Sequence, residues 1–188
     1  RFIYSYVFNV SRISHVNVEN CEFYGGSGSA FINEGVLTIT DSTFKNILSE
    51  AVILNHATVN VHDSIFDSLT SAPSMGLAIS NYGTATIKNS IFKDSTIYGE
   101  ERVYGLLYNK GYMAVESCIF DSNTAVFVLY PIGTANIYNV GELNATYNVF
   151  IKNNEFDINE VHGDDDHKYI DVYNDRAGSA FIDFNWWD

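Results

Sequence analysis

The stretch Asn33-Glu-Gly-Val-Leu-Thr-Ile-Thr-Asp-Ser-Thr-Phe44 has a spacing that recurs along the chain. An asparagine is followed six positions later by a β-branched residue and eleven positions later by a phenylalanine, and the same spacing begins at Asn55, Asn81 and Asn109. Pro131 begins a fifth unit that lacks its phenylalanine. Short alternating segments that repeat about every 20 to 28 residues, without a helical pattern, predict a solenoid of stacked β-coils.

Aligning the units on their phenylalanines separates inward from outward positions, because alternate residues of a strand face opposite sides. The aligned phenylalanines are Phe23, Phe44, Phe66, Phe92 and Phe120, with a weaker sixth at Phe156. The residues five positions earlier are Val18, Ile39, Val61, Ile87 and Val115. Polar residues alternate with these apolar ones, so we expect one apolar core with a polar exterior.

One motif recurs in one orientation, which favours parallel stacking over hairpins joined by two-residue turns. We predict an all-β, right-handed, single-stranded parallel β-helix of about six to eight coils that forms a single domain over residues 1–188; the handedness follows from the rule for parallel crossovers. Stacking pairs the backbone of inner coils and leaves the end coils with exposed edges. Trp186 and Trp187 are expected to cover one open end, and the alternative is an exposed platform for carbohydrate.

The composition excludes some partners. The 188 residues carry 10 basic and 23 acidic side chains, a net charge of −13, which repels phosphate backbones and argues against nucleic acid. No apolar run approaches the roughly 18 residues of a membrane span. The chain opens at Arg1 without an initiator methionine, so we expect a fragment of a larger surface protein whose other parts supply any membrane attachment.

The two cysteines, Cys21 and Cys118, occupy the same slot of the first and fifth coils. Four rises of about 4.8 Å place them roughly 19 Å apart. A disulfide needs Cα atoms within about 7 Å. We therefore predict two free, buried thiols.

Catalysis on a polysaccharide would need carboxylates at a controlled separation. Asp41 and Asp63 stack in adjacent coils and are the strongest candidates. The same slot continues as Asn20, Asn89 and Ser117. Because these residue types hold turns through side-chain hydrogen bonds, we interpret the slot as a turn and predict no catalytic residue.

The segment His162-Gly-Asp-Asp-Asp-His167 is the densest group of metal-ligand types. Its carboxylates suit Ca²⁺ and its histidines suit a transition metal, but the spacing matches no EF-hand loop. A solvated acidic loop is the favoured interpretation, so no cofactor is predicted. Whether Asp164–Asp166 bind Ca²⁺ stays open.

Insertions lengthen two successive coils at 67–76 and 93–105, and we expect them to form one projecting lobe. Repeat proteins often place binding surfaces in such insertions. Tyr98, Tyr104 and Tyr108 are the candidate binding residues, able to stack on sugars or to pack on a partner protein. The alternative is that these tyrosines cover the sheet.

The repeat Asn-x-Gly-x-Leu-Thr-Ile-x-[Asp/Asn]-Ser-[Thr/Ile]-Phe, with its closing Asn185-Trp-Trp187, resembles that of large cell-surface adhesin-like proteins of methanogenic archaea. The resemblance covers roughly residues 12–130 and the end motif, although Asn55 departs from the Asn-x-Gly form and Asp188 stands where a glycine often follows the tryptophans.

This resemblance implies the pectin-lyase-like superfamily of parallel β-helices and an extracellular, cell-surface location. It implies a non-catalytic module that binds a glycan or protein of another cell, or that acts as a rigid stalk. The same superfamily contains polysaccharide lyases and hydrolases, which is the alternative. The acidic composition argues against an anionic polymer as substrate.

Overall fold

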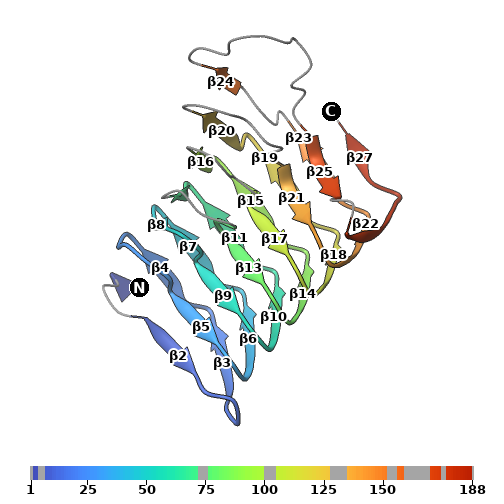
Figure 1. The fold of residues 1–188 in the computed structure, drawn as a ribbon. Helices are drawn as coiled ribbons and strands as arrows, with labels where there is room; N and C mark the ends of the chain where they lie inside the picture. The colour runs from blue at the N-terminus through green and yellow to red at the C-terminus, as the bar shows by residue number, and fades with distance from the viewer. Residues whose placement is uncertain are drawn as a thin grey trace.

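The computed structural model is an all-β parallel solenoid of about five turns (Figure 1). It describes residues 2–3, 7–71, 76–99, 105–127, 135–151, 156–158, 170–174 and 177–187. None of these residues lies in a helix, so none forms a helix able to span a membrane. The two ends of the chain lie at opposite ends of the stack.

Successive coils contribute strands to four sheets. The phenylalanine sheet consists of β1 (Phe2–Ile3), β4 (Glu22–Tyr24), β7 (Thr43–Lys45), β11 (Ile65–Asp67), β15 (Ile91–Lys93), β19 (Ile119–Asp121), β23 (Val149–Ile151) and β27 (Trp186–Trp187). The wide sheet consists of β3 (His15–Glu19), β6 (Val36–Thr40), β10 (Thr58–His62), β14 (Thr84–Lys88), β18 (Tyr112–Glu116), β22 (Glu142–Thr146) and β26 (Ser179–Asp183).

The other two sheets complete each turn. The asparagine sheet consists of β2 (Phe8–Val10), β5 (Phe31–Asn33), β9 (Ile53–Asn55), β13 (Ile79–Asn81), β17 (Leu107–Asn109), β21 (Ala135–Asn139) and β25 (Ile170–Asn174). The minor sheet consists of β8 (Leu48–Ser49), β12 (Thr70–Ser71), β16 (Thr96–Gly99), β20 (Thr124–Phe127) and β24 (Phe156–Ile158).

The predicted parallel solenoid is confirmed, because equivalent strands of neighbouring coils pair in parallel, as β10 does with β6 and β14. The minor sheet has five strands, so five turns contribute to all four sheets, and the range of six to eight coils is not confirmed. Right-handedness stays a prediction.

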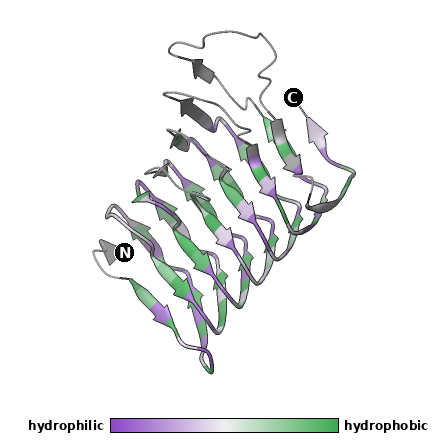
Figure 2. Cartoon of the chain, in the orientation of Figure 1, coloured by the Kyte–Doolittle hydropathy of each residue, from purple (hydrophilic) through white to green (hydrophobic). Residues whose placement is uncertain are grey.

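Stacked phenylalanines form the centre of the core. The rings of Phe23, Phe44, Phe66, Phe92, Phe120 and Phe150 follow one another with centroid separations of 4.8–5.0 Å and nearly parallel planes. Figure 2 shows apolar residues recurring along the strands of successive coils. Each buried aromatic adds a large apolar area to the core, which makes this column a main source of stability.

The sequence alignment fails at the sixth coil. Phe150 pairs with Phe120, whereas Phe156, the predicted sixth anchor, pairs with Ala125 in the minor sheet. The unit begins at Asn139, and its sequence signal is weak because Ala145, rather than a β-branched residue, stands six positions after Asn139. Pro131, the predicted start of a fifth unit, lies outside the described residues.

A ladder of asparagine side chains, buried from Asn33 to Asn139 and exposed at its last member, runs along the solenoid axis. Each Nδ2 donates to the Oδ1 of the next asparagine at 2.6–2.8 Å, in the order Asn33, Asn55, Asn81, Asn109, Asn139 and Asn174. In Asn109, for example, the Oδ1 also accepts from the backbone N–H of Gly111. Buried polar groups are stable when they are hydrogen-bonded in this way, and the ladder fixes the register of the coils.

The slot two positions before the phenylalanines of the first five coils holds only serine or cysteine, and it includes both cysteines. Ser42 Oγ accepts from the backbone N–H of Cys21 at 3.2 Å and donates to the carbonyl of Thr40 at 2.8 Å. Both thiols are free, as predicted, although Cys21 is only half-buried. Burial raises the pKa of Cys118 to about 12, which keeps this thiol protonated and unreactive.

The two tryptophans of the last coil do not occupy equivalent positions. Trp187 stacks on Phe150 at 4.5 Å and extends the core, whereas Trp186 lies on the opposite face of β27 and does not share that contact. The segment Gly178–Asp183 matches Gly28–Asn33 at all but the last residue, yet β26 belongs to the wide sheet and β5 to the asparagine sheet. Similar sequences therefore occupy positions that are not equivalent in the two coils.

Candidate functional site

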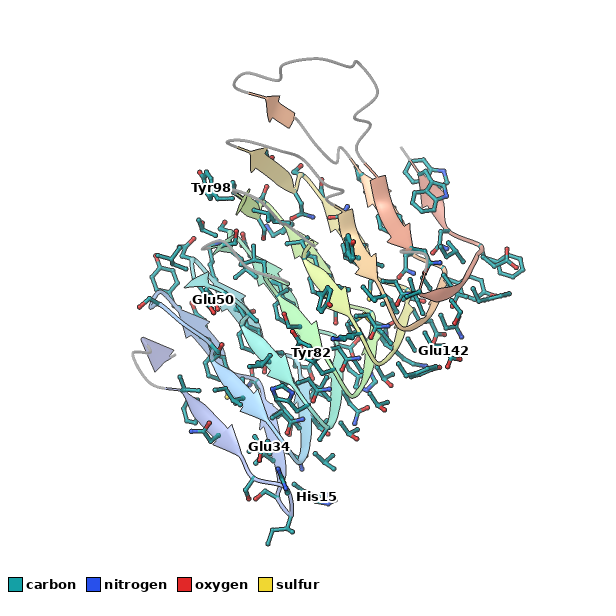
Figure 3. All side chains as sticks on the ribbon, viewed as in Figure 1. His15, Glu34, Glu50, Tyr82, Tyr98 and Glu142 are labelled. Carbon is teal, nitrogen blue, oxygen red and sulfur yellow. The ribbon has the colours of Figure 1, made fainter. Side chains whose placement is uncertain are left out.

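Tyr98 and Tyr108, two of the three tyrosines predicted to bind, lie on different sheets. Tyr98 lies in the minor sheet and is 44% exposed, and Figure 3 shows it projecting away from Tyr82. Tyr108 lies in the asparagine sheet and is 5% exposed, with its ring between those of Tyr82 and Tyr138. This burial matches the alternative in which Tyr108 covers the sheet. Tyr104 lies outside the described residues.

The slot of Asp41 and Asp63 is a turn, as interpreted from the sequence. Both residues have positive φ angles, of 49° and 51°. The same left-handed conformation recurs at Asn20, Asn89, Ser117, Tyr147 and Phe184. Short polar side chains tolerate this conformation because they hydrogen-bond locally, so the two aspartates have a structural explanation.

The predicted acidic loop, His162–His167 with Asp164–Asp166, lies outside the described residues. Within the described part of the chain, no three side chains of His, Cys, Asp or Glu are grouped as metal ligands.

Exposed aromatic side chains gather in the last three coils of the wide and phenylalanine sheets. They are Tyr112, Tyr147, Phe181, Phe184, Trp186 and Trp187. In the coils before them, the outward positions of the wide sheet are short or polar, as in Thr38, Asn60 and Thr86. The C-terminal third of the solenoid therefore has a different surface from the rest.

A hollow of about 310 Å³ lies on the outer face of the wide sheet in this aromatic region. Its side-chain lining consists of Tyr112, Glu142, Asn144, Ser179 and Phe181, with Leu143 and Ala180 beneath. The pairing register explains the arrangement. Tyr112, Glu142 and Ser179 are direct neighbours across β18, β22 and β26, and Asn144 is opposite Phe181.

Two aromatic rings rim this hollow at diagonal corners. Tyr112 is 37% exposed and Phe181 is 57% exposed. They lie two strands apart, roughly 10 Å along the solenoid axis. The shorter side chains of Glu142 and Asn144 lie between them, so the hollow is bounded by aromatic walls and has polar groups at its centre.

The polar groups of the hollow are available to a ligand. No hydrogen bond or ion pair within the described residues engages the side chains of Glu142, Asn144 or Ser179. Figure 3 shows Glu142 projecting outward from β22. By contrast, Glu116 on the same sheet is paired with Lys88 at 2.6 Å.

A second aromatic pair lies at the turn that follows the wide sheet. The rings of Tyr147 and Phe184 stack at 5.2 Å with an interplanar angle of 7°. Both residues have positive φ, a conformation that costs an ordinary L-residue roughly 1–2 kcal/mol. Bulky residues thus stand where earlier coils have Asp, Asn or Ser, and their rings extend the aromatic surface towards Trp186.

Sequence reasoning missed the hollow and this pair. The signal was present, since Tyr147 and Phe184 each stand three positions before a member of the stacked aromatic column, Phe150 or Trp187, just as Asp41 stands three positions before Phe44. The misplaced sixth unit hid that alignment.

Comparison of the chain with protein-family models, with curated proteins and with solved structures gives no match. The chemistry of the hollow is therefore the basis for a function. Aromatic rings that flank free carboxylate, amide and hydroxyl groups can stack on the apolar face of a sugar ring and hydrogen-bond its hydroxyl groups.

Proposed function

We propose that this chain is a non-catalytic, extracellular, adhesin-like module that binds a cell-surface glycan in the hollow between Tyr112 and Phe181. The observation that carries the proposal is the combination of two exposed rings with three unengaged polar side chains on one face of a sheet. Sugars have polar edges, which the polar side chains can hydrogen-bond, and apolar faces, on which the two rings can pack. The partner is a glycan on the surface of another cell.

The rigidity of the wide sheet supports this proposal. The lining residues alternate with Leu143 and Ala145, whose side chains are buried in the core. Backbone pairing fixes the spacing of β18, β22 and β26. A site on paired strands holds its side chains more accurately than a site on a loop, which lowers the ordering cost of binding.

We assign the solenoid to the right-handed, pectin-lyase-like β-helices on the resemblance of its repeat to the adhesin-like proteins of methanogens. The net charge of −13 disfavours anionic polysaccharides as ligands.

A glycan array tests the proposal with three forms of the protein. The unsubstituted chain and Tyr98→Ala should be retained on the same glycans, whereas the double variant Tyr112→Ala/Phe181→Ala should lose retention. Loss of each stacked ring removes about 1 kcal/mol, so the pair should weaken binding about tenfold or more. Tyr98→Ala is the matched control, because it removes an exposed tyrosine from another sheet.

Three other outcomes would point to a different site, to a rigid stalk or to an enzyme. Loss of retention in Tyr98→Ala alone would move the site to the minor sheet. Absence of retention on every glycan would contradict binding and favour a rigid stalk. Release of cleaved product would contradict the non-catalytic proposal.

A further inference from the structure

The charge distribution around the hollow indicates which sugars it takes, if the proposed glycan binding holds. Glu142 is the one carboxylate in the lining, and the lining has no lysine, arginine or histidine. Lys110, in the turn before β18, forms no ion pair with Glu142 in the described chain. The hollow therefore offers a negative charge that its own residues leave unneutralised.

The two rings strengthen the preference for a positive charge. The faces of tyrosine and phenylalanine carry negative electrostatic potential and attract an ammonium group within about 6 Å of the ring centre. Tyr112 is the direct strand neighbour of Glu142, and Phe181 is the direct neighbour of Asn144. A cation at Glu142 thus lies next to Tyr112.

The size of the hollow limits the ligand. Its volume of about 310 Å³ is at the lower end of ligand pockets, which are about 300–1,000 Å³. This volume suits one sugar residue within a longer chain. The amide of Asn144 and the hydroxyl of Ser179 remain for the hydroxyl groups of that residue.

We propose that the hollow binds an amino sugar with a free primary ammonium group. The ammonium pairs with the carboxylate of Glu142 beside the ring of Tyr112, and the apolar face of the pyranose packs on Phe181. This inference rests on the proposed glycan binding and adds the chemical class of the sugar.

Calorimetric titration of the whole chain tests it with three matched oligosaccharides: a glucosamine trimer, its N-acetylated form and a glucose trimer. We expect the glucosamine trimer to bind about threefold to tenfold more tightly than the other two, as for a solvent-accessible charge-assisted contact. High salt should reduce this preference. The variant Glu142→Gln should abolish this preference, so that the three trimers bind with similar affinity.

The variant Glu116→Gln is the matched control, since the same substitution is made on the same sheet at a carboxylate that Lys88 already pairs. It should keep the preference. Equal binding of all three trimers, or a preference that survives in Glu142→Gln, would overturn the amino-sugar inference and leave glycan binding intact. Binding of no trimer would overturn the amino-sugar inference, and retention on the glycan array would then decide whether glycan binding stands.

A lysine side chain carries the same ammonium group, so Nα-acetyl-lysine amide is included as a further titrant. Binding of this amide as tight as that of the glucosamine trimer, with the same dependence on Glu142, would assign the hollow to a protein ligand and overturn the inference.

Discussion

The second coil, Phe31 to Ser49, and the last coil, Ile170 to Trp187, place their strands in the same stacks but differ in the residues they turn outward. In the second coil the turn after the wide sheet has Asp41, and in the last coil it has Phe184. The inward residues change much less, since Phe44 and Trp187 are both members of one aromatic column. Stacking thus constrains the interior, and the exterior is free to differ between coils.

The largest expected effect tests the interior side of this comparison. Phe92→Ala removes a fully buried ring that stacks on Phe66 and Phe120, and it should lower the free energy of unfolding by about 3–5 kcal/mol. Phe181→Ala removes an exposed ring and should cost less than about 0.5 kcal/mol. Denaturant titrations followed by circular dichroism would measure both. Similar losses in the two variants would contradict the division into constrained interior and free exterior.

A smaller effect concerns an ion pair on the outer face of the phenylalanine sheet. Its carboxylate, Asp67, is an outward residue that is nevertheless held in place by its neighbours. Asp67 is buried and accepts from Lys45 Nζ at 2.6 Å and from Ser68 Oγ at 2.6 Å, with Lys93 Nζ at 3.6 Å. Burial alone would raise the pKa of Asp67, but these hydrogen bonds and the charge of Lys93 outweigh it and lower the pKa below its usual value.

The lowered pKa of Asp67 makes the stability of the fold depend on pH. A lowered pKa in the folded state stabilises the fold above about pH 4, the pKa of an unfolded aspartate, and this stabilisation is lost as pH falls through the folded-state pKa. Asp67→Asn should cost about 1–2 kcal/mol at neutral pH. The difference from the unsubstituted chain should shrink below pH 4 in thermal melts recorded across pH. A constant difference would show that the charge of Asp67 is not involved.

The smallest expected effect comes from exchanging residues between the turn after the wide sheet in an early coil and the same turn in the last coil. Phe184→Asn replaces a bulky residue at φ 54° by one that tolerates this conformation, and the gain offsets the lost contact with Tyr147. We expect a change in unfolding free energy within about 0.5 kcal/mol. The reverse exchange, Asp63→Phe, has no stacking partner and should destabilise by roughly 1–2 kcal/mol. A stabilisation of roughly 1–2 kcal/mol in Phe184→Asn, opposite in sign to the loss in Asp63→Phe, would mean in thermal melts that the Tyr147 contact contributes nothing.

The inward slots of the first five coils were predictable from the sequence because similar residues recur in each of them. Ser42, Phe44 and their equivalents must fit the same space, so the spacing of six and eleven residues persists in spite of the insertions. The sixth coil was misplaced because Ala145 fills a slot that larger β-branched residues fill elsewhere.

The hollow was not predictable in the same way. It combines Tyr112, Glu142 and Ser179, which are separated by insertions of different length and became neighbours only through the strand register. Outward residues do not have to stack in the core, so no repeated sequence pattern marks them. Tyr98 and Tyr108 are close together in the sequence, but they lie on strands of different sheets.

The asparagine ladder gives every interior coil the same chemical connection to the coil before and the coil after it. Each amide accepts from one neighbour and donates to the other, as Asn81 does between Asn55 and Asn109. A whole coil can therefore be gained or lost in evolution without leaving an unmatched bond. Each added coil lengthens the solenoid by about 4.8 Å. The number of coils therefore sets the distance between the C-terminal hollow and the opposite end.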